Sequence, residues 1–225
     1  ENPYIARIKV PTLWFSPTND FHAHQDNFTY TWRKVPDELL GLALSPHFNH
    51  RHADDASLTA TLWFEQHLKG KFTLPHSPRL AWERAADGNV AFIISPDQSR
   101  PVKEVRLYAS TDAHTLTRFW RTIPVVAQGK AWRGSMAVRD PREPLFAFAN
   151  IVYEAPEEYR QIPTNPGVGR SDTFLVSSRP LALTGEQLVA AGVRACAKPE
   201  AMIDDGERGW QDWYRLNWGN PTLWS

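Results

Sequence analysis

The sequence predicts an α/β unit at the N-terminus, an all-β sandwich in the middle and the start of a third module at the end. Three observations lead to this fold class. Strand-like and helix-like runs alternate over residues 1–76, short strand-like runs alone fill residues 79–182, and the composition changes again from about residue 183. Strand, helix, strand, helix is the order of a parallel α/β sheet. We therefore expect three structural units, with the third over residues 183–225.

The N-terminal unit contains two apolar runs that are typical of buried strands. Residues 8–16 (IKVPTLWFS) are rich in β-branched and aromatic side chains, and residues 38–46 (ELLGLALSP) are continuously apolar, as strands covered on both faces are. Residues 24–35 can form a short helix between them. A second helix is expected over residues 56–68, because apolar side chains recur there at helical spacing and Gly70 stands where a helix would end.

The middle unit consists of short runs with alternating apolar side chains, separated by Gly, Pro, Asp and Asn turn signals. Many short strands at this spacing predict an antiparallel β-sandwich. Arg118 and Arg121 are interpreted as structural arginines that stack on aromatic rings or pair with Asp112. The inward-facing residues that we expect are Phe92, Ile94, Val105, Leu107, Phe119, Phe146, Phe148, Ile151 and Phe174.

Composition and charge exclude several classes of protein. Lys+Arg and Asp+Glu both number 25, so the formal net charge is zero and there is no basic field to hold a nucleic acid. No stretch approaches the roughly 20 apolar residues of a membrane span. Cys196 is the single cysteine, which excludes an internal disulfide and a CxxC zinc site. We expect no nucleic-acid partner, no membrane span and no cofactor.

Two histidine-rich segments follow the predicted strands of the N-terminal unit: TNDFHAHQD at residues 18–26 and HFNHRH at residues 47–52. In an open parallel sheet, the loops at the carboxyl ends of adjacent strands converge. Asp20 and His50 are therefore expected side by side, where the carboxylate can accept a hydrogen bond from one imidazole nitrogen while the other takes a proton. His52 is the alternative base.

A metal site is the competing interpretation of these segments. Imidazole and carboxylate groups are ligands of zinc and other transition metals, and H-x-H in an extended segment is a real ligand spacing. No HExxH-type helix holds two ligands in register, which weighs against the metal. The side chains that would supply the ligands are His22, His24, Asp26, His47, His50 and His52.

The segments VPTLWFSPTNDFH, SPHFNHRH and WFEQHLKG resemble the last two strands and final helix of an α/β-hydrolase of the dienelactone hydrolase or acetyl-xylan-esterase-like kind, a serine hydrolase family. The resemblance covers about residues 5–76. It implies that Asp20 takes the acid position and His50 the general-base position. It also implies a small-molecule or carbohydrate ester as substrate and a secreted or periplasmic location.

The middle unit carries a second resemblance. EVRLYASTD, TRFWR and PLFAFANIVYE are similar to the domain that follows the hydrolase domain in multidomain bacterial relatives and in proteins akin to the PhoPQ-activated pathogenicity-related family. This similarity implies an immunoglobulin-like or fibronectin-like sandwich behind a catalytic domain.

The chain departs from the hydrolase pattern at the nucleophile. The family's serine lies in a G-x-S-x-G elbow, and no such sequence occurs in these 225 residues. Ser16, Ser45 and Ser135 lack the strand–serine–helix context. We therefore expect the nucleophile and the oxyanion hole to lie upstream of this chain, in a domain against which residues 1–76 pack, and we expect the chain alone to be inactive.

The last segment, IDDGERGWQDWYRLNWGNPTLW, resembles the opening of a galactose-binding-like jelly-roll module. Such a module needs on the order of eight strands, so the chain is expected to stop inside a domain. The aromatic residues expected in its incomplete core are Trp210, Trp213, Tyr214, Trp218 and Trp224.

The function that these features favour is the C-terminal part of a serine-type carboxylic-ester hydrolase. A β-sandwich carbohydrate-binding or interaction module with a degenerate hydrolase remnant is the alternative from another class. A prolyl-oligopeptidase-like peptidase remains open as well, because it uses the same Asp and His arrangement.

Overall fold

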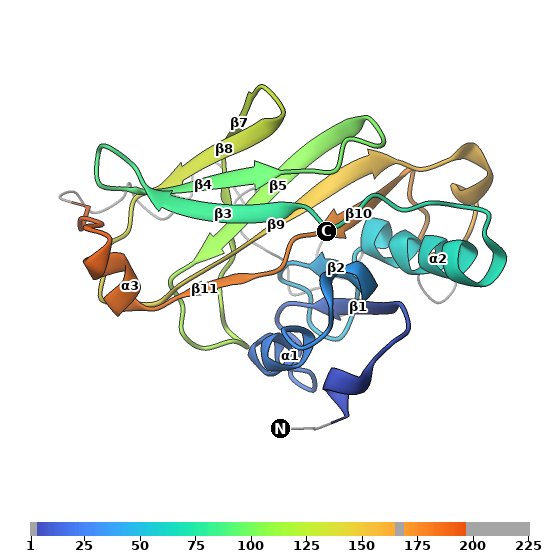
Figure 1. Cartoon of the computed structure of the whole chain (residues 1–225), viewed down its shortest axis with the longest axis horizontal. Coiled ribbons are helices and arrows are strands. Elements are labelled where there is room, and N and C mark those ends of the chain that lie inside the picture. Colours follow the sequence, from blue (N-terminus) through green and yellow to red (C-terminus); the bar gives the residue numbers. More distant parts are fainter. Residues whose placement is uncertain (1–3, 165–168, 197–225) are drawn as a thin grey trace, which may run out of the picture.

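A computed structural model describes residues 4–164 and 169–196 of the chain. Two parallel strands with flanking helices come first, and two antiparallel sheets follow (Figure 1). The mixed α/β character that the sequence predicts is confirmed at this level.

The first sheet consists of β1 (Thr12–Pro17) and β2 (Leu40–Ser45), which run in parallel from the pair Thr12 and Leu40 to the pair Pro17 and Ser45. Helix α1 (Gln25–Trp32) lies in the crossover between them. Every residue of β2 is buried, which agrees with its uninterrupted apolar sequence. Short 3₁₀ turns precede the two strands, η1 (Ile5–Arg7) and η2 (Asp37–Leu39).

Helix α2 (Asp54–Lys69) follows β2. The Ser45 hydroxyl accepts a hydrogen bond from the N–H of Ala53 at 3.0 Å, just before the helix begins. Asp54 and Asp55 occupy the first turn, where carboxylates interact favourably with the helix dipole. The helix ends at Gly70, whose φ of 63° is the left-handed conformation that glycine adopts without steric cost.

The remaining strands form two antiparallel sheets, called the sheet pair below. The first has the order β3 (Arg79–Arg84), β4 (Val90–Ser95), β8 (Ala131–Met136), β7 (Val125–Gln128). The second has the order β10 (Thr173–Ser177), β9 (Leu145–Glu154), β5 (Val102–Ser110), β6 (Arg121–Ile123), and β11 (Leu181–Leu183) also pairs with β9. The 3₁₀ turn η3 (Glu157–Tyr159) and helix α3 (Gly185–Ala190) complete the described elements.

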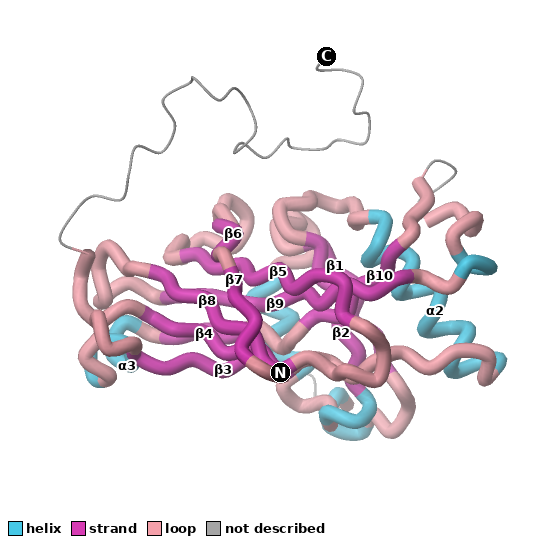
Figure 2. The backbone as a smooth tube through the Cα atoms, turned by 90° about the horizontal axis from the view of Figure 1, so that it is seen from above, coloured by secondary structure: helices cyan, strands magenta, loops and turns pink. Residues whose placement is uncertain are grey.

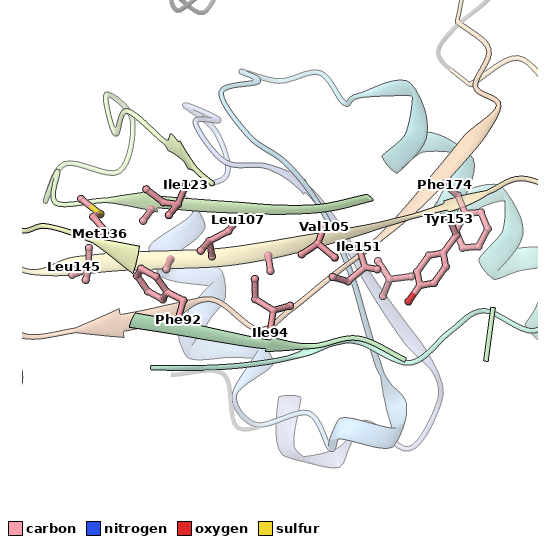
Figure 3. Packing of buried hydrophobic residues seen from close by; sticks show 14 of the residues in the cluster. Phe92, Ile94, Val105, Leu107, Ile123, Met136, Leu145, Ile151, Tyr153 and Phe174 are labelled. Carbon is pink, nitrogen blue, oxygen red and sulfur yellow. The ribbon is translucent and has the colours of Figure 1, made fainter. Parts of the chain in front are cut away.

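The core of the sheet pair lies between its two sheets. Phe92 and Ile94 of β4 face Val105 and Leu107 of β5 and Ile151 of β9 (Figure 3). All five side chains are buried, and so is Phe174 of β10, which belongs to the same cluster. For these six residues the predicted inward orientation is confirmed.

Three of the residues predicted for this core face elsewhere. Phe119 lies in the segment between β5 and β6 and is 44% exposed. Phe148 is buried, but on the opposite face of β9 from Ile151, in a second cluster with Trp120 against which Phe146 packs. The reason is the two-residue period of a strand, which puts even-numbered residues of β9 on one face and odd-numbered residues on the other.

Two strand-like runs of the middle unit, TRFWRTIPVV at residues 117–126 and TFLVSSRPLAL at residues 173–183, each predict a single strand from the sequence but are divided in the structure. The run at residues 117–126 breaks at Pro124, so that β6 belongs to one sheet and β7 to the other. The run at residues 173–183 splits into β10 and β11, and Pro180 lies between them. Proline has no N–H to donate to a ladder, which makes it a natural point for a strand to end.

Buried side-chain hydrogen bonds join the parallel strands to the sheet pair, where β2 runs beside β10 (Figure 2). The Ser177 hydroxyl accepts from the Leu44 N–H at 2.8 Å and donates to the side-chain oxygen Oδ1 of Asn150 at 2.6 Å. The Asn150 amide donates to the Leu44 carbonyl at 2.9 Å. This triangle, which we call the junction, satisfies both backbone groups of Leu44.

Helix α2 joins the sheet pair in a similar way. The Thr59 hydroxyl donates to the Leu175 carbonyl at 2.6 Å and accepts from the Leu175 N–H at 3.1 Å. Leu58 and Leu62 of the helix are buried in the same cluster as the core of the sheet pair. The predicted units 1–76 and 79–182 therefore share one hydrophobic core.

The predicted third module falls largely outside the described residues. Of residues 183–225 the structure describes 183–196, which contain α3 and its capping box of Thr184 and Gln187. Trp210, Trp213, Tyr214, Trp218 and Trp224 lie outside the described residues. None of the described helices combines the length and apolarity that a bilayer crossing needs.

Removing one hydroxyl tests the junction. Ser177→Ala leaves the Leu44 N–H and Asn150 Oδ1 without this partner in a buried site, so we expect the free energy of unfolding to fall by about 1–3 kcal/mol. The measurement is urea unfolding with comparison of the midpoints. Ser135→Ala, at an exposed position of strand β8, is the matched control and should change the midpoint little. Equal midpoint shifts in both variants would contradict the role of the junction.

Candidate functional site

Asp20 and His50 meet at the carboxyl ends of the two parallel strands. Asp20 follows β1, and His50 follows β2. His50 Nδ1 lies 3.2 Å from Asp20 Oδ2. The hydrogen-bond contact expected from the sequence is present in the structure.

The Asp20 carboxylate is held in a buried position, with the residue 6% exposed. Its Oδ1 accepts a hydrogen bond from the His22 N–H at 2.7 Å, and Oδ2 faces His50. Burial raises the pKa of this carboxyl group, but the hydrogen bonds from His22, His50 and Ala23 and the charge interaction with His50 together hold the pKa below its ordinary value. Asp20 is therefore an anion at neutral pH, as the partner of an imidazolium must be.

His50 is fixed at one end and open at the other. Nδ1 faces Asp20, while the side chain as a whole is 62% exposed. The rings of Phe21 and His22 lie 5.6 Å and 4.9 Å from the His50 ring. An exposed imidazole edge opposite a buried carboxylate is the arrangement that lets Nε2 exchange a proton with a reacting group.

The backbone around His50 is also unusual. His47 and His50 have φ angles of 64° and 55°, and among the described residues they are the non-glycine positions with positive φ. Histidine is enriched in this left-handed region relative to most residues, but the conformation still costs of the order of 1 kcal/mol or more. The turn after β2 thus contains two residues in the energetically unfavourable left-handed conformation, and in this turn the His50 side chain faces Asp20.

His52, the alternative base, has a different environment. Its ring stacks on Phe15 with the ring centroids 3.5 Å apart and 19° between the planes. Burial lowers the pKa of His52 to about 4, with the Asp20 charge opposing this shift and His50 adding to it. A neutral, stacked imidazole has the character of a packing residue. The geometry favours His50 over His52 as the partner of Asp20.

His47 makes a structural contact. Its Nε2 lies 2.7 Å from the carbonyl oxygen of Trp120, so this nitrogen carries the proton and donates. Burial lowers the pKa of His47 to about 4, against the opposing effect of that hydrogen bond. The residue joins the turn after β2 to the sheet pair.

Several of the side chains proposed for a metal site make other contacts. Asp26 binds the Arg118 guanidinium through both carboxylate oxygens, at 2.8 and 3.0 Å. His24 directly precedes helix α1 at its N-cap position. Within residues 4–164 and 169–196, no three His, Cys, Asp or Glu side chains come together as a ligand group. The geometry therefore gives the metal alternative no support.

An open groove of about 450 Å³ lies beside the base. It is bounded by the turn that carries His50 and His52 and by the side of helix α2 that presents Ser57, Thr61 and Phe64. The Phe64 side chain is 59% exposed. This groove of mixed polar and apolar lining next to His50 leaves room for a ligand or for another segment of polypeptide.

Sequence reasoning missed the distant partners of two residues that shape this region. Asn19, interpreted as part of a turn, donates its amide hydrogens to the carbonyls of Leu116 and Arg118. Arg118, interpreted as a structural arginine that stacks on aromatic rings or pairs with Asp112, does stack 3.6 Å over the Phe146 ring. Its guanidinium binds the Asp26 carboxylate, and its Nε donates to the backbone carbonyl of Asp112. Arg118 is structural, as interpreted, but its carboxylate partner lies in helix α1.

Comparisons of the chain with protein-family models, with curated proteins and with solved structures found no match.

The shifted imidazoles give a test by pH. His52 has a folded-state pKa of about 4 against 6.5 in an ordinary environment, so the unfolded chain binds the proton more readily between these values. Above pH 6.5 His52 is neutral in both states and does not reduce the free energy of unfolding. As the pH falls toward 4, protonation of His52 in the unfolded chain lowers the free energy of unfolding, by an amount of the order of 2 kcal/mol. We expect His52→Phe, which retains an aromatic ring against Phe15, to reduce the loss of unfolding free energy between pH 7 and pH 4.5. A substitution of the exposed His67 is the control, and an unchanged pH dependence in His52→Phe would contradict the assignment.

Proposed function

We propose that this chain carries the acid and base residues of a serine-type carboxylic-ester hydrolase of the dienelactone hydrolase or acetyl-xylan-esterase-like class. The observation that carries the proposal is the contact between His50 Nδ1 and the buried Asp20 carboxylate at 3.2 Å, at the carboxyl ends of adjacent parallel strands. In open α/β sheets, ligands and catalytic groups collect at this edge. The chain order, acid before histidine, is that of α/β-hydrolases.

The proposed chemistry assigns one step to each residue. His50 takes the proton of a serine hydroxyl at Nε2 as the hydroxyl attacks the ester carbonyl, and it returns the proton to the departing alcohol. Asp20 accepts the Nδ1–H hydrogen bond, which fixes the imidazole tautomer and stabilises the imidazolium. A water molecule activated by His50 then releases the acyl group. No metal or cofactor takes part in this mechanism.

The nucleophile is proposed to come from outside these 225 residues, because they contain no G-x-S-x-G sequence. The sheet supports this part of the proposal. In the part of the chain that the structure describes, β1 pairs with β2 alone, whereas parallel sheets normally have several strands covered on both faces. The outer edge of β1 is where further strands of a hydrolase sheet would pair.

The rest of the chain completes the proposal. Residues 79–182 would be an immunoglobulin-like or fibronectin-like sandwich behind the catalytic domain, and residues 183–225 would begin a galactose-binding-like module. The substrate class is a small-molecule or carbohydrate ester.

The proposal is tested in the longer protein that contains this chain and its upstream serine elbow. We expect His50→Ala to lower ester turnover by about 10⁴-fold or more, because the members of a triad act as a unit, and a metal chelator to leave turnover unchanged. His67→Ala, at an exposed position on helix α2, is the control and should retain activity.

Two results would overturn the proposal. Ester hydrolysis by the 225-residue chain alone would show that the nucleophile has been misplaced. Loss of activity with chelator and recovery with zinc would favour a metal mechanism instead.

A further inference from the structure

One segment of the sheet pair lies across both loops of the candidate site. Residues 111–120, between β5 and β6, contact the loop after β1 through Asn19, whose Nδ2 donates to the carbonyls of Leu116 at 3.1 Å and Arg118 at 2.8 Å. The same segment contacts the turn after β2 through the Trp120 carbonyl, which accepts from His47 Nε2 at 2.7 Å. We call residues 111–120 the bridging segment.

The two loops are also tied to each other at the same place. The Asn19 N–H donates to the Phe48 carbonyl at 3.1 Å, and the Thr18 hydroxyl donates to Asn19 Oδ1 at 2.7 Å. The same hydroxyl accepts from the His47 N–H at 2.9 Å. Asn19 thus takes part in contacts with the turn after β2 and with the bridging segment, and it directly precedes Asp20 in the chain.

The bridging segment is itself firmly held. Arg118 is 2% exposed, and its guanidinium donates to both carboxylate oxygens of Asp26 in helix α1. It also donates to the backbone carbonyls of Asp112 and Ala113 at 2.8 and 3.2 Å, which closes the segment on itself. The guanidinium carbon lies 3.6 Å from the centroid of the Phe146 ring. A buried arginine that makes four hydrogen bonds gives the segment a fixed shape.

We propose that Asn19 is a positioning residue, through which the bridging segment holds Asp20 in hydrogen-bond contact with His50. The catalytic importance of this positioning rests on the proposed function. The contact that Asn19 maintains between Asp20 and His50 is a structural property of the 225-residue chain and can be tested independently of that function. Backbone hydrogen bonds from the Thr18 N–H to the Ser45 carbonyl and from the Asn19 N–H to the Phe48 carbonyl tie the loop that carries Asp20 to the neighbouring strand and turn. The two side-chain amide hydrogen bonds of Asn19 add the connection to the bridging segment, so the sheet pair becomes part of the acid–base site.

Asn19→Asp isolates this effect because the side chains have almost the same shape. The carboxylate cannot donate to the carbonyls of Leu116 and Arg118, and its charge is repelled by both oxygens. The loop should then move away from the bridging segment and carry Asp20 out of reach of His50. A neutral imidazole places its proton on the nitrogen that has an acceptor, so His50 should lose the Nδ1–H form that Asp20 stabilises.

The experiment is a long-range ¹H–¹⁵N correlation spectrum of the histidine side chains in the ¹⁵N-labelled 225-residue chain at a pH where the imidazoles are neutral. We expect His50 to be in the Nδ1–H form in the wild type and to shift to the Nε2–H form in Asn19→Asp. Asn19→Ala removes the same two hydrogen bonds without the charge and should shift the tautomer in the same direction, which provides a second variant if Asn19→Asp does not fold.

Arg179→Ala is the matched control. Arg179 also connects the sheet pair to the N-terminal unit, through the carbonyls of Trp32 and Val35, each at 2.9 Å, but it does not contact the loop that carries Asp20. The His50 tautomer should stay Nδ1–H in this variant. A tautomer change in Arg179→Ala equal to that in Asn19→Asp would overturn the positioning role, because general loosening would then explain both.

The remaining outcomes separate this inference from the proposed function. If His50 is Nδ1–H in the wild type and in both folded Asn19 variants, the positioning role is wrong and the acid–base pair stands. If His50 is already Nε2–H in the wild type, Asp20 does not hold it, and the inference and the acid–base pair fail together.

Discussion

The structure depends on a buried set of hydrogen bonds that join strand β2 to the sheet pair without strand pairing. Ser177 and Asn150 satisfy both backbone groups of Leu44, and Thr59 does the same for Leu175 from the side of helix α2. An unpaired backbone group in such a place would cost about 1–3 kcal/mol. Short polar side chains are suited to this role because they supply a donor and an acceptor within the space of a tight sheet-to-sheet contact. They allow two sheets of different type to meet in one core.

The position of the candidate site follows from this joint. Because β2 is fixed against β10, the loops at the carboxyl ends of β1 and β2 lie against the bridging segment. Asn19 and His47 complete the contact from the two loops. The N-terminal unit alone is a two-stranded sheet, and such a sheet is marginal in isolation. The geometry of Asp20 and His50 is therefore a property of both units together, with the turn around His50 held in a costly backbone conformation by its surroundings.

Local sequence patterns were sufficient to predict the elements that frame the site. The apolar runs at residues 8–16 and 38–46 predicted both strands, although β1 begins only at Thr12, and the glycine after α2 predicted the helix end. Burial on both faces produces an apolar run, and the left-handed cap favours glycine, so both features are visible in the sequence. The contact of Asp20 with His50 followed from adjacency of parallel strands. The errors arose where the periodicity was not applied strictly, as for Phe146 and Phe148, or where a proline moved the chain from one sheet to the other.

Contacts distant in sequence could not be predicted in this way. The partners of Asn19 are the carbonyls of Leu116 and Arg118, and backbone carbonyls carry no sequence signal. Asp26 was assigned to a possible metal site because its carboxylate is a common ligand, yet the structure pairs it with Arg118. The chemistry of a side chain limits the partners that it can bind, and the tertiary fold determines which of those partners lies close to it.

The claim on which the functional interpretation depends is that Asp20 acts through His50. A double-mutant comparison of ester turnover tests it most directly, with Asp20→Ala, His50→Ala and the double variant in the proposed longer protein that would supply the serine. If the two residues form one acid–base unit, the double variant will be about as active as His50→Ala alone, because residues that act as a unit lose activity together. Independent losses that multiply in the double variant would contradict this claim, and so would an Asp20→Ala variant with wild-type turnover.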